Sequence, residues 1–168
     1  MPVNEEQFKS AVSRILDRNR LIARVAIARK KGARVVLANG CFDVLHVGHV
    51  RYLEGAKALG DILVVGVNSD EQVRAQKGEG RPLVPAADRA AVLRSLGCVD
   101  AVLVFDEDTP EAALDLVRPH VWAKGGDYAG VDLPEAPVVA RWGGTAVVLP
   151  YLEGRSTSRL VAEAARRA

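Results

Sequence analysis

Short apolar runs rich in β-branched residues recur along this 168-residue chain, and stretches with helical spacing separate them. Runs of this kind are typical of strands buried on both faces. Their alternation with helices predicts right-handed crossovers and a parallel sheet. The predicted fold class is therefore α/β, with a single doubly wound five-stranded parallel sheet. We expect the strands at about 34–39, 62–67, 101–105, 121–123 and 145–149.

Helical spacing also predicts one long helix from about Asn4 to Lys31, interrupted by no Pro or Gly. Residues 1–32 would then be an N-terminal helical extension, and residues 33–168 would form the α/β domain. The segment QKGEGRPLVP at 76–85 holds two Gly and two Pro, so it predicts a loop. Further helices are expected at about 49–59, from Ser69, at 86–96, from Pro110, at 134–142 and from Ser156 to the end.

Composition limits the classes of partner. The formal net charge is only +2, and hydrophobic residues make up 49% of the chain, which suits a soluble globular protein without a nucleic-acid or membrane surface. No stretch approaches ~20 uninterrupted apolar residues, and the polar N-terminus lacks a signal-peptide core. Cys41 and Cys98 are the only cysteines, which argues against a disulfide framework and a zinc site. We therefore expect a cytoplasmic protein.

The segment richest in chemistry runs from Asn39 to His49, between the first strand and the helix after it. An anion at such a position meets unpaired N–H groups and the positive end of the helix dipole. His46 and His49 are three residues apart, and Gly48 between them lets backbone approach a phosphate closely. Two imidazoles and a set of amides aimed at one phosphorus suit phosphoryl or nucleotidyl transfer. The alternative is that both histidines are ordinary surface or capping residues.

The sequence GCFDVLHVGH at 40–49 resembles the HxGH signature of the nucleotidyltransferase superfamily, which includes glycerol-phosphate cytidylyltransferase and phosphopantetheine adenylyltransferase. Further segments, VNSD, KGEGRP, EDTP, KGGDY and EGRSTS, follow in matching order and look like those of D-glycero-β-D-manno-heptose 1-phosphate adenylyltransferases. The resemblance runs from about Arg34 to the C-terminus and implies a Rossmann-like nucleotidyltransferase fold. In that family the activity is often a domain fused behind a sugar kinase. This chain has no room for a kinase domain, so the resemblance implies the stand-alone form.

The resemblance also implies roles for the matching residues. His46 and His49 would contact the triphosphate and stabilise the transition state at the α-phosphorus, and Lys77 would close over the β- and γ-phosphates from a flexible loop. The nucleotide would be bound by Asn39, Gly40, Cys41, Phe42, Gly48, Arg89, Lys124, Gly126, Ser156, Thr157 and Ser158. The acceptor substrate would be bound by Asp43, Arg81, Asp127 and Tyr128.

Several of these residues have structural alternatives. Asp43 could hold the loop rather than touch substrate, and both Lys77 and Arg81 could be solvated. Arg89 could pair with a local carboxylate instead of a phosphate. The hydroxyls of residues 156–158 could cap the last helix, although capping and phosphate binding are compatible.

The leading hypothesis is an enzyme that joins ATP and a heptose 1-phosphate to give ADP-heptose and pyrophosphate. A cytidylyltransferase acting on glycerol 3-phosphate or another alcohol phosphate is the first alternative. Its last motif looks like RTEGISTT, whereas this chain has YLEGRSTS, with Tyr151 in place of the arginine and Arg155 in place of an apolar residue. A non-catalytic nucleotide-binding module is the second alternative.

Cofactor and assembly expectations follow from the same observations. No cluster of Asp and Glu marks a protein-held metal, so Mg²⁺ would be held largely by the triphosphate and water. By resemblance, and from the apolar stripe of the N-terminal helix, we expect a homodimer. Its other partners would be the nucleoside triphosphate and the phosphorylated acceptor, with no nucleic acid or membrane.

Overall fold

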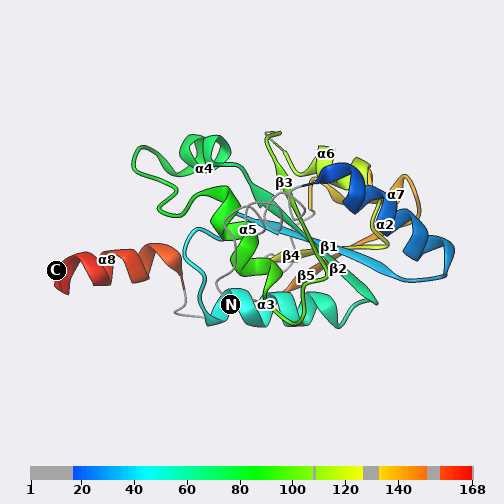
Figure 1. The fold of residues 1–168 in the computed structure, drawn as a ribbon, viewed down its shortest axis with the longest axis horizontal. Coiled ribbons are helices and arrows are strands. Elements are labelled where there is room, and N and C mark those ends of the chain that lie inside the picture. Colours follow the sequence, from blue (N-terminus) through cyan, green and yellow to red (C-terminus); the bar gives the residue numbers. More distant parts are fainter. Residues whose placement is uncertain (1–16, 108, 127–132, 151–155, 168) are drawn as a thin grey trace, which may run out of the picture.

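The computed structural model describes residues 17–107, 109–126, 133–150 and 156–167. Five parallel strands form one sheet in the order β3-β2-β1-β4-β5 (Figure 1). This arrangement confirms the predicted α/β fold class. The strands are β1 (Val35–Gly40), β2 (Ile62–Asn68), β3 (Ala101–Phe105), β4 (Val121–Gly125) and β5 (Thr145–Leu149).

The strand order reverses beside β1. From β1 the chain passes outward to β2 and β3, and then returns to β4 on the other side of β1. The loops that leave β1 and β4 therefore diverge at their carboxyl ends, which opens a crevice where open α/β sheets bind ligands.

Helices cover both faces of the sheet. On one face pack α3 (Val47–Lys57) and α5 (Ala86–Arg94), and on the other pack α2 (Arg18–Lys30), α6 (Glu111–Val117) and α7 (Ala136–Ala140). Two further helices follow the carboxyl ends of β2 and β5, namely α4 (Asp70–Lys77) and α8 (Thr157–Arg167). Of these, α8 extends away from the rest of the molecule (Figure 1).

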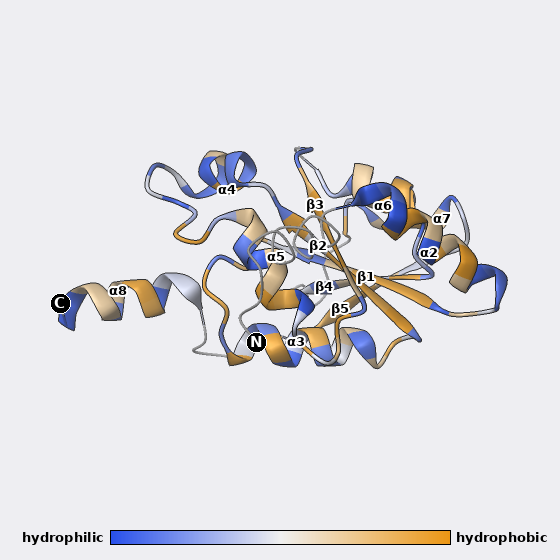
Figure 2. Cartoon of the chain, viewed as in Figure 1, coloured by the Kyte–Doolittle hydropathy of each residue, from blue (hydrophilic) through white to orange (hydrophobic). Residues whose placement is uncertain are grey.

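The core consists of two apolar layers divided by the sheet, whose strands are mostly hydrophobic (Figure 2). Successive side chains of a strand point to opposite faces, and β1 supplies both layers in this way. Val36 and Ala38 pack under α3 and α5, whereas Val35 and Leu37 pack under α2, α6 and α7. All four are fully buried, which explains why β1 reads as a continuous apolar run rather than an alternating one.

The predicted single helix from Asn4 to Lys31 is wrong, because a helix begins at Arg18. Asp17 has an extended backbone and its side chain accepts a hydrogen bond from the Arg20 N–H, so it is an N-cap. Leu21 and Val25 on α2 are buried in the second apolar layer, so α2 packs against the sheet. The rest of the expected extension lies outside the described residues, and the boundary at residue 32 stays a prediction.

Two other boundaries differ from the expectation in ways that matter for the site. The helix expected to begin at His49 begins at Val47, because His46 caps it. The loop expected at 76–85 begins only at Gly78, so Lys77 is the last residue of α4 rather than a loop residue. Within the described ranges, no helix combines the length and the apolar character needed to cross a membrane.

Candidate active site

A cavity of about 210 Å³ lies at the carboxyl ends of β1 and β4, where the strand order reverses. Its walls come from β1 and the loop after it, from α3, from the end of α4, from β4 and from the start of α8. Eight of the residues predicted to bind nucleotide or act in catalysis line it, together with two that the sequence did not suggest. The lining residues are Asn39, Gly40, Cys41, Phe42, Gly48, His49, Tyr52, Lys77, Gly125 and Thr157.

The loop after β1 turns sharply at Phe42, which has a left-handed backbone with φ of 49°. The Phe42 ring is buried and folds back over Gly40, where an added Cβ would come within 3.2 Å of the ring. The same ring meets His49 edge to face, with centroids 5.3 Å apart. Gly40 and Phe42 therefore shape one wall of the cavity through sterics.

His46 and His49 form a reciprocal cap at the start of α3. The Gly48 N–H donates to Nδ1 of His46 at 3.1 Å, and the His46 N–H donates to Nδ1 of His49 at 3.3 Å. The two rings stack with centroids 3.9 Å apart, and His49 lines the cavity. Because each Nδ1 accepts a hydrogen bond, the proton of each neutral ring resides on Nε2. Capping and a catalytic role are therefore compatible here, since the cap uses Nδ1 and leaves Nε2–H as a donor.

The pKa of His49 falls to about 4. Burial is the main cause, the Lys77 ammonium adds to it, and protonation of the neighbouring His46 would lower the pKa further. At neutral pH His49 is therefore an uncharged hydrogen-bond donor held in one tautomer by the backbone.

Another part of the cavity wall is built from β1, α3 and β4. The Asn39 side-chain oxygen accepts a hydrogen bond from Nε1 of the buried Trp122 at 3.0 Å, which fixes the amide. The Tyr52 hydroxyl donates to the Ala123 carbonyl at 2.7 Å, and an added Cβ at Gly125 would lie 3.1 Å from the Tyr52 ring. Sequence reasoning missed Tyr52 as a site residue, although its position three residues after His49 puts it on the same helix face.

Two residues bring a cation and a thiol to the cavity. Lys77 reaches it from the last turn of α4. Cys41 lines it, and burial raises the pKa of this thiol despite the opposing charges of Lys77 and Arg89. A protonated thiol is a weak nucleophile, so the cavity is suited to binding rather than to covalent catalysis.

The three hydroxyls at the start of α8 differ in their surroundings. Thr157 is buried, lines the cavity and donates to the Val44 carbonyl at 3.1 Å, which ties α8 to the loop after β1. The Ser156 side chain accepts from the Arg159 N–H at 3.2 Å and caps α8. Ser158 is exposed, and neither serine lines the cavity.

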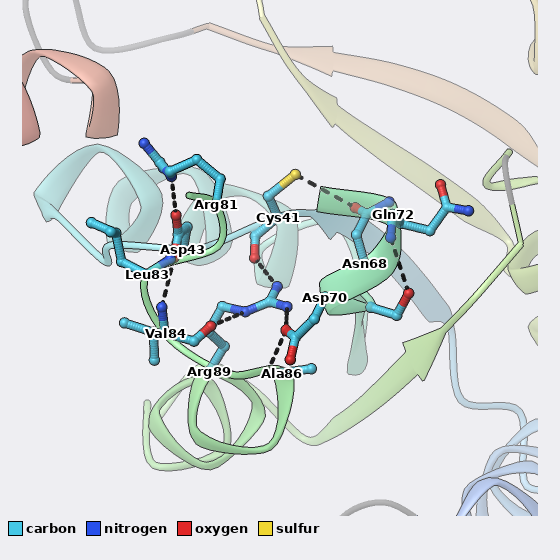
Figure 3. A network of polar contacts seen from close by, with 11 residues as sticks. Cys41, Asp43, Asn68, Asp70, Gln72, Arg81, Leu83, Val84, Ala86 and Arg89 are labelled. Carbon is cyan, nitrogen blue, oxygen red and sulfur yellow. Dashed lines mark hydrogen bonds and ion pairs between the residues drawn. The ribbon is translucent and has the colours of Figure 1, made fainter. Parts of the chain in front are cut away.

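Asp43 holds the loop at 81–84, which favours its structural alternative over the predicted contact with substrate. One carboxylate oxygen accepts the N–H groups of Leu83 and Val84, and the other accepts Nε of Arg81 at 2.5 Å (Figure 3). Burial alone would raise the pKa of Asp43, but these hydrogen bonds and the Arg81 charge hold it below its usual value. Arg81 does not line the cavity, yet its Nη2 is buried and has no hydrogen-bond partner among the described residues.

Arg89 is a buried structural residue here, not a wall of the cavity. Its side chain is 1% exposed and pairs with Asp70 at 2.7 Å, so the structure favours the carboxylate alternative over the predicted nucleotide contact. Its other nitrogens donate to the carbonyls of Val84 and Cys41 (Figure 3).

The residues expected after β4 are only partly described. Nζ of Lys124 lies 3.5 Å from a Glu135 carboxylate oxygen and 5.3 Å from the centre of the Trp122 ring, and the Gly126 N–H donates to the Leu149 carbonyl. Neither Lys124 nor Gly126 lines the cavity. Asp127 and Tyr128 lie outside the described residues.

Comparison with known proteins fits this geometry. The cytidylyltransferase-like family model matches residues 37–137, a span from the middle of β1 to α7 that includes both histidines. The chain belongs to the cytidylyltransferase-like family.

Curated proteins that are similar in sequence match nearly the whole chain. It is 56% identical over 167 residues to the "Bifunctional protein HldE" of Streptomyces coelicolor, covering 99% of this chain and 35% of that protein. It is 45% identical over 153 residues to the protein of the same name from Citrifermentans bemidjiense, covering 91% of this chain and 31% of that protein. The chain thus spans about a third of the length of the curated relatives it matches.

A solved structure supports the same cytidylyltransferase-like fold. The lipopolysaccharide core biosynthesis protein from Thermoplasma volcanium superposes with a TM-score of 0.59 at 28% sequence identity, covering 73% of this chain and 99% of that one.

Proposed function

We propose that this chain transfers AMP from ATP to a sugar 1-phosphate, giving an ADP-sugar and pyrophosphate. An oxygen of the acceptor phosphate attacks the α-phosphorus, and the bond from the α-phosphorus to the oxygen bridging to the β-phosphorus breaks. The protein supplies no atom to either bond, so its task is to position the two substrates and to stabilise charge.

The observation that carries the proposal is the histidine pair at the amino end of α3. In both rings Nδ1 accepts a backbone N–H, so a neutral ring carries its proton on Nε2. We assign these donors to the non-bridging oxygens of the α-phosphate, where negative charge grows in the transition state. A neutral, preorientated donor needs no reorganisation as that charge develops.

Lys77 is assigned to the departing pyrophosphate. It reaches the cavity from the last turn of α4. The first residue of this helix, Asp70, is held by a hydrogen bond from Arg89. An ammonium at this place offsets negative charge on the leaving group. Thr157, at the start of α8, also lines the cavity, where the N–H groups of a helix start can bind phosphate.

Arg81 is assigned to the acceptor phosphate. Asp43 holds its Nε, and its buried Nη2 lacks a hydrogen-bond partner within the described part of the chain. A buried, unpaired guanidinium nitrogen costs free energy until an anion binds it.

A heptose 1-phosphate is the acceptor we favour, and ATP the donor. Support comes from the resemblance of the motifs between 34 and 168 and from the curated relatives, in addition to Tyr151, which stands where glycerol-phosphate cytidylyltransferases have an arginine. A cytidylyltransferase acting on glycerol 3-phosphate is the alternative that the family assignment supports best.

Any Mg²⁺ would enter with the triphosphate. Among the described residues, no carboxylate lines the cavity, and no group of three His, Cys, Asp or Glu residues is suited to a metal. The metal would be held by phosphate oxygens and water, and would neutralise phosphate charge. We place the reaction in the cytoplasm, where the free thiols of Cys41 and Cys98 would stay reduced.

A homodimer remains our proposal for the assembly, and it rests mainly on the family resemblance. Leu21 and Val25 of α2 are buried in the core and cannot serve as an exposed stripe. Light scattering at micromolar protein concentration tests the assembly, and a monomer at that concentration would reject the homodimer.

A screen of pyrophosphate release tests the function. ATP, CTP, GTP, UTP and dTTP are each paired with heptose 1-phosphate, glucose 1-phosphate and glycerol 3-phosphate. Release that requires ATP together with a sugar 1-phosphate supports the proposal. Binding of nucleotide without release from any pair would favour the non-catalytic module.

A further inference from the structure

Arg89 is the largest fully buried charged side chain among the residues that the structure describes, and the proposed reaction gives it no task. It lies on α5 beneath the loop after β1, at 1% side-chain exposure, and it does not line the cavity. A buried guanidinium is retained only where its donors are satisfied, and its contacts therefore indicate what it does.

Each nitrogen of Arg89 holds a different segment. Nη1 donates to the Cys41 carbonyl in the loop after β1, Nε donates to the Val84 carbonyl at 2.9 Å, and Nη2 donates to Asp70 at 2.7 Å (Figure 3). These three segments approach from separate parts of the sequence, and the planar fork of one guanidinium fixes their relative positions.

Asp70 extends the same contact to two helices. It is the first residue of α4, and the carboxylate oxygen that accepts from Arg89 also accepts the Ala86 N–H at 2.8 Å, at the start of α5. The far end of α4 is Lys77, which lines the cavity. Arg89 therefore contacts two parts of the structure that form the cavity. One is Cys41 in the cavity wall, and the other is α4, the helix that ends at Lys77.

We propose that Arg89 and Asp70 are positioning residues that set the nucleotide loop and the Lys77 helix for the transfer step. This inference rests on the proposed function for its kinetic part, but its structural part does not depend on turnover. It differs from a direct phosphate contact by Arg89, because a phosphate ligand would act without Asp70.

Cys41 supplies a native reporter of the loop. Its thiol lines the cavity and is half-buried, while its carbonyl is held by Arg89. In a Cys98→Ser background, iodoacetamide reacts with this thiol alone. Arg89→Lys and Asp70→Ala should each accelerate alkylation of the nucleotide-free protein about tenfold, the factor that corresponds to one lost buried hydrogen bond. Asp88→Ala removes a neighbouring exposed carboxylate from the first turn of α5 and should leave the rate unchanged.

Kinetics provide the second readout. Arg89→Lys should lower kcat/KM for ATP about a hundredfold, as displacement of a reacting group by about 1 Å does. Asp70→Ala should lower it at least fivefold, and the double variant should be no worse than Arg89→Lys alone, because both changes break one network. Where Arg89→Lys melts below the assay temperature, Asp70→Ala carries the test, since the Asp70 side chain is 41% exposed.

Two results would overturn the inference. One is alkylation of Cys41 at the parent rate in both variants. The other is a loss of ATP use in Arg89→Lys with a normal Asp70→Ala variant, which would make Arg89 a direct phosphate ligand. Should the parent release no pyrophosphate from any triphosphate, the proposed function fails, and the alkylation rates still decide whether Arg89 and Asp70 set the loop.

Discussion

The backbone N–H of His46 donates to Nδ1 of His49, while Nδ1 of His46 accepts the N–H of Gly48. The pair thus replaces the Ser and Glu of an ordinary capping box, in which two side chains satisfy two backbone donors reciprocally. The hydroxyl of a serine cap is occupied by its hydrogen bond to the backbone, whereas an imidazole that caps through Nδ1 still has Nε2. Because two residues separate the histidines, the same two side chains can cap the start of α3 and place imidazole nitrogens there for catalysis.

The first prediction concerns the tautomer. At pH 7 the His49 ring should be neutral with its proton on Nε2, and it should titrate only near pH 4, because burial and the nearby cations lower its pKa. Nitrogen-detected NMR of histidine-labelled protein measures both properties. A midpoint for His49 near 6.5 would contradict the assignment.

The same pKa gives the sign of a stability effect. An unfolded chain binds a proton at His49 below about pH 6.5, whereas the folded chain binds it only near pH 4. The contribution of His49 to stability is therefore lost as the pH falls through this window. His49→Gln should show a weaker fall in the free energy of unfolding between pH 6.5 and 4 than the parent does, measured by urea titration. His120, whose pKa is also lowered, remains in both proteins and cancels in the difference.

The third prediction separates capping from catalysis at His46. An Asn side chain can cap α3 but offers no donor in the place of Nε2. Both His46→Asn and His46→Ala should lose about a hundredfold or more in turnover, as other transition-state donors do. Only the Ala variant should also lose about 1 kcal/mol of stability, because it lacks a cap. Near-full turnover in the Asn variant would mean that His46 is a cap alone.

The sheet could be predicted from the sequence because fully buried strands leave a strong local signal. The bounds expected for β3 and β5 agree with the structure, and those of the other strands differ by one or two residues. The start of α2 could not be predicted in the same way. Asp17 sits within a stretch of continuous helical spacing, and whether an aspartate caps a helix or faces solvent inside it depends on tertiary contacts.

The cavity wall was predictable where the motif itself forms it, as at Asn39 and Phe42. The roles of Asp43 and Arg89 were not, because a charged residue in a motif is equally consistent with binding a ligand and with holding the loop. Only their burial and their partners distinguish the two roles. Arg89 pairs with Asp70, nineteen residues away, and no local pattern predicts such a pair.

The fourth prediction concerns Lys77. Lys77→Ala should weaken the use of ATP more than it weakens binding of the ADP-sugar product, because the lost charge faces the departing pyrophosphate. Arg74→Ala removes a cation from the same helix turn without touching the cavity and is the matched control. Product affinity from calorimetry is compared with kcat/KM for ATP. Equal effects of Lys77→Ala on both would count against the placement.

The last prediction concerns substrate choice. A heptose offers several hydroxyls, so its pocket needs polar groups beyond a phosphate clamp, and Lys124, Asp127 and Tyr128 are the candidates. Buried polar groups that go unmatched are costly, so a site built for hydroxyls discriminates strongly against an acceptor with fewer of them. We expect kcat/KM for heptose 1-phosphate with ATP to exceed that for glycerol 3-phosphate with CTP by at least about a hundredfold. Asp127→Ala should erode this preference more than it weakens ATP binding, which separates the acceptor pocket from the nucleotide cavity. Equal or higher efficiency with CTP and glycerol 3-phosphate would reject the heptose assignment. The nucleotidyl transfer itself would stand, because it rests on the histidine pair and not on the acceptor.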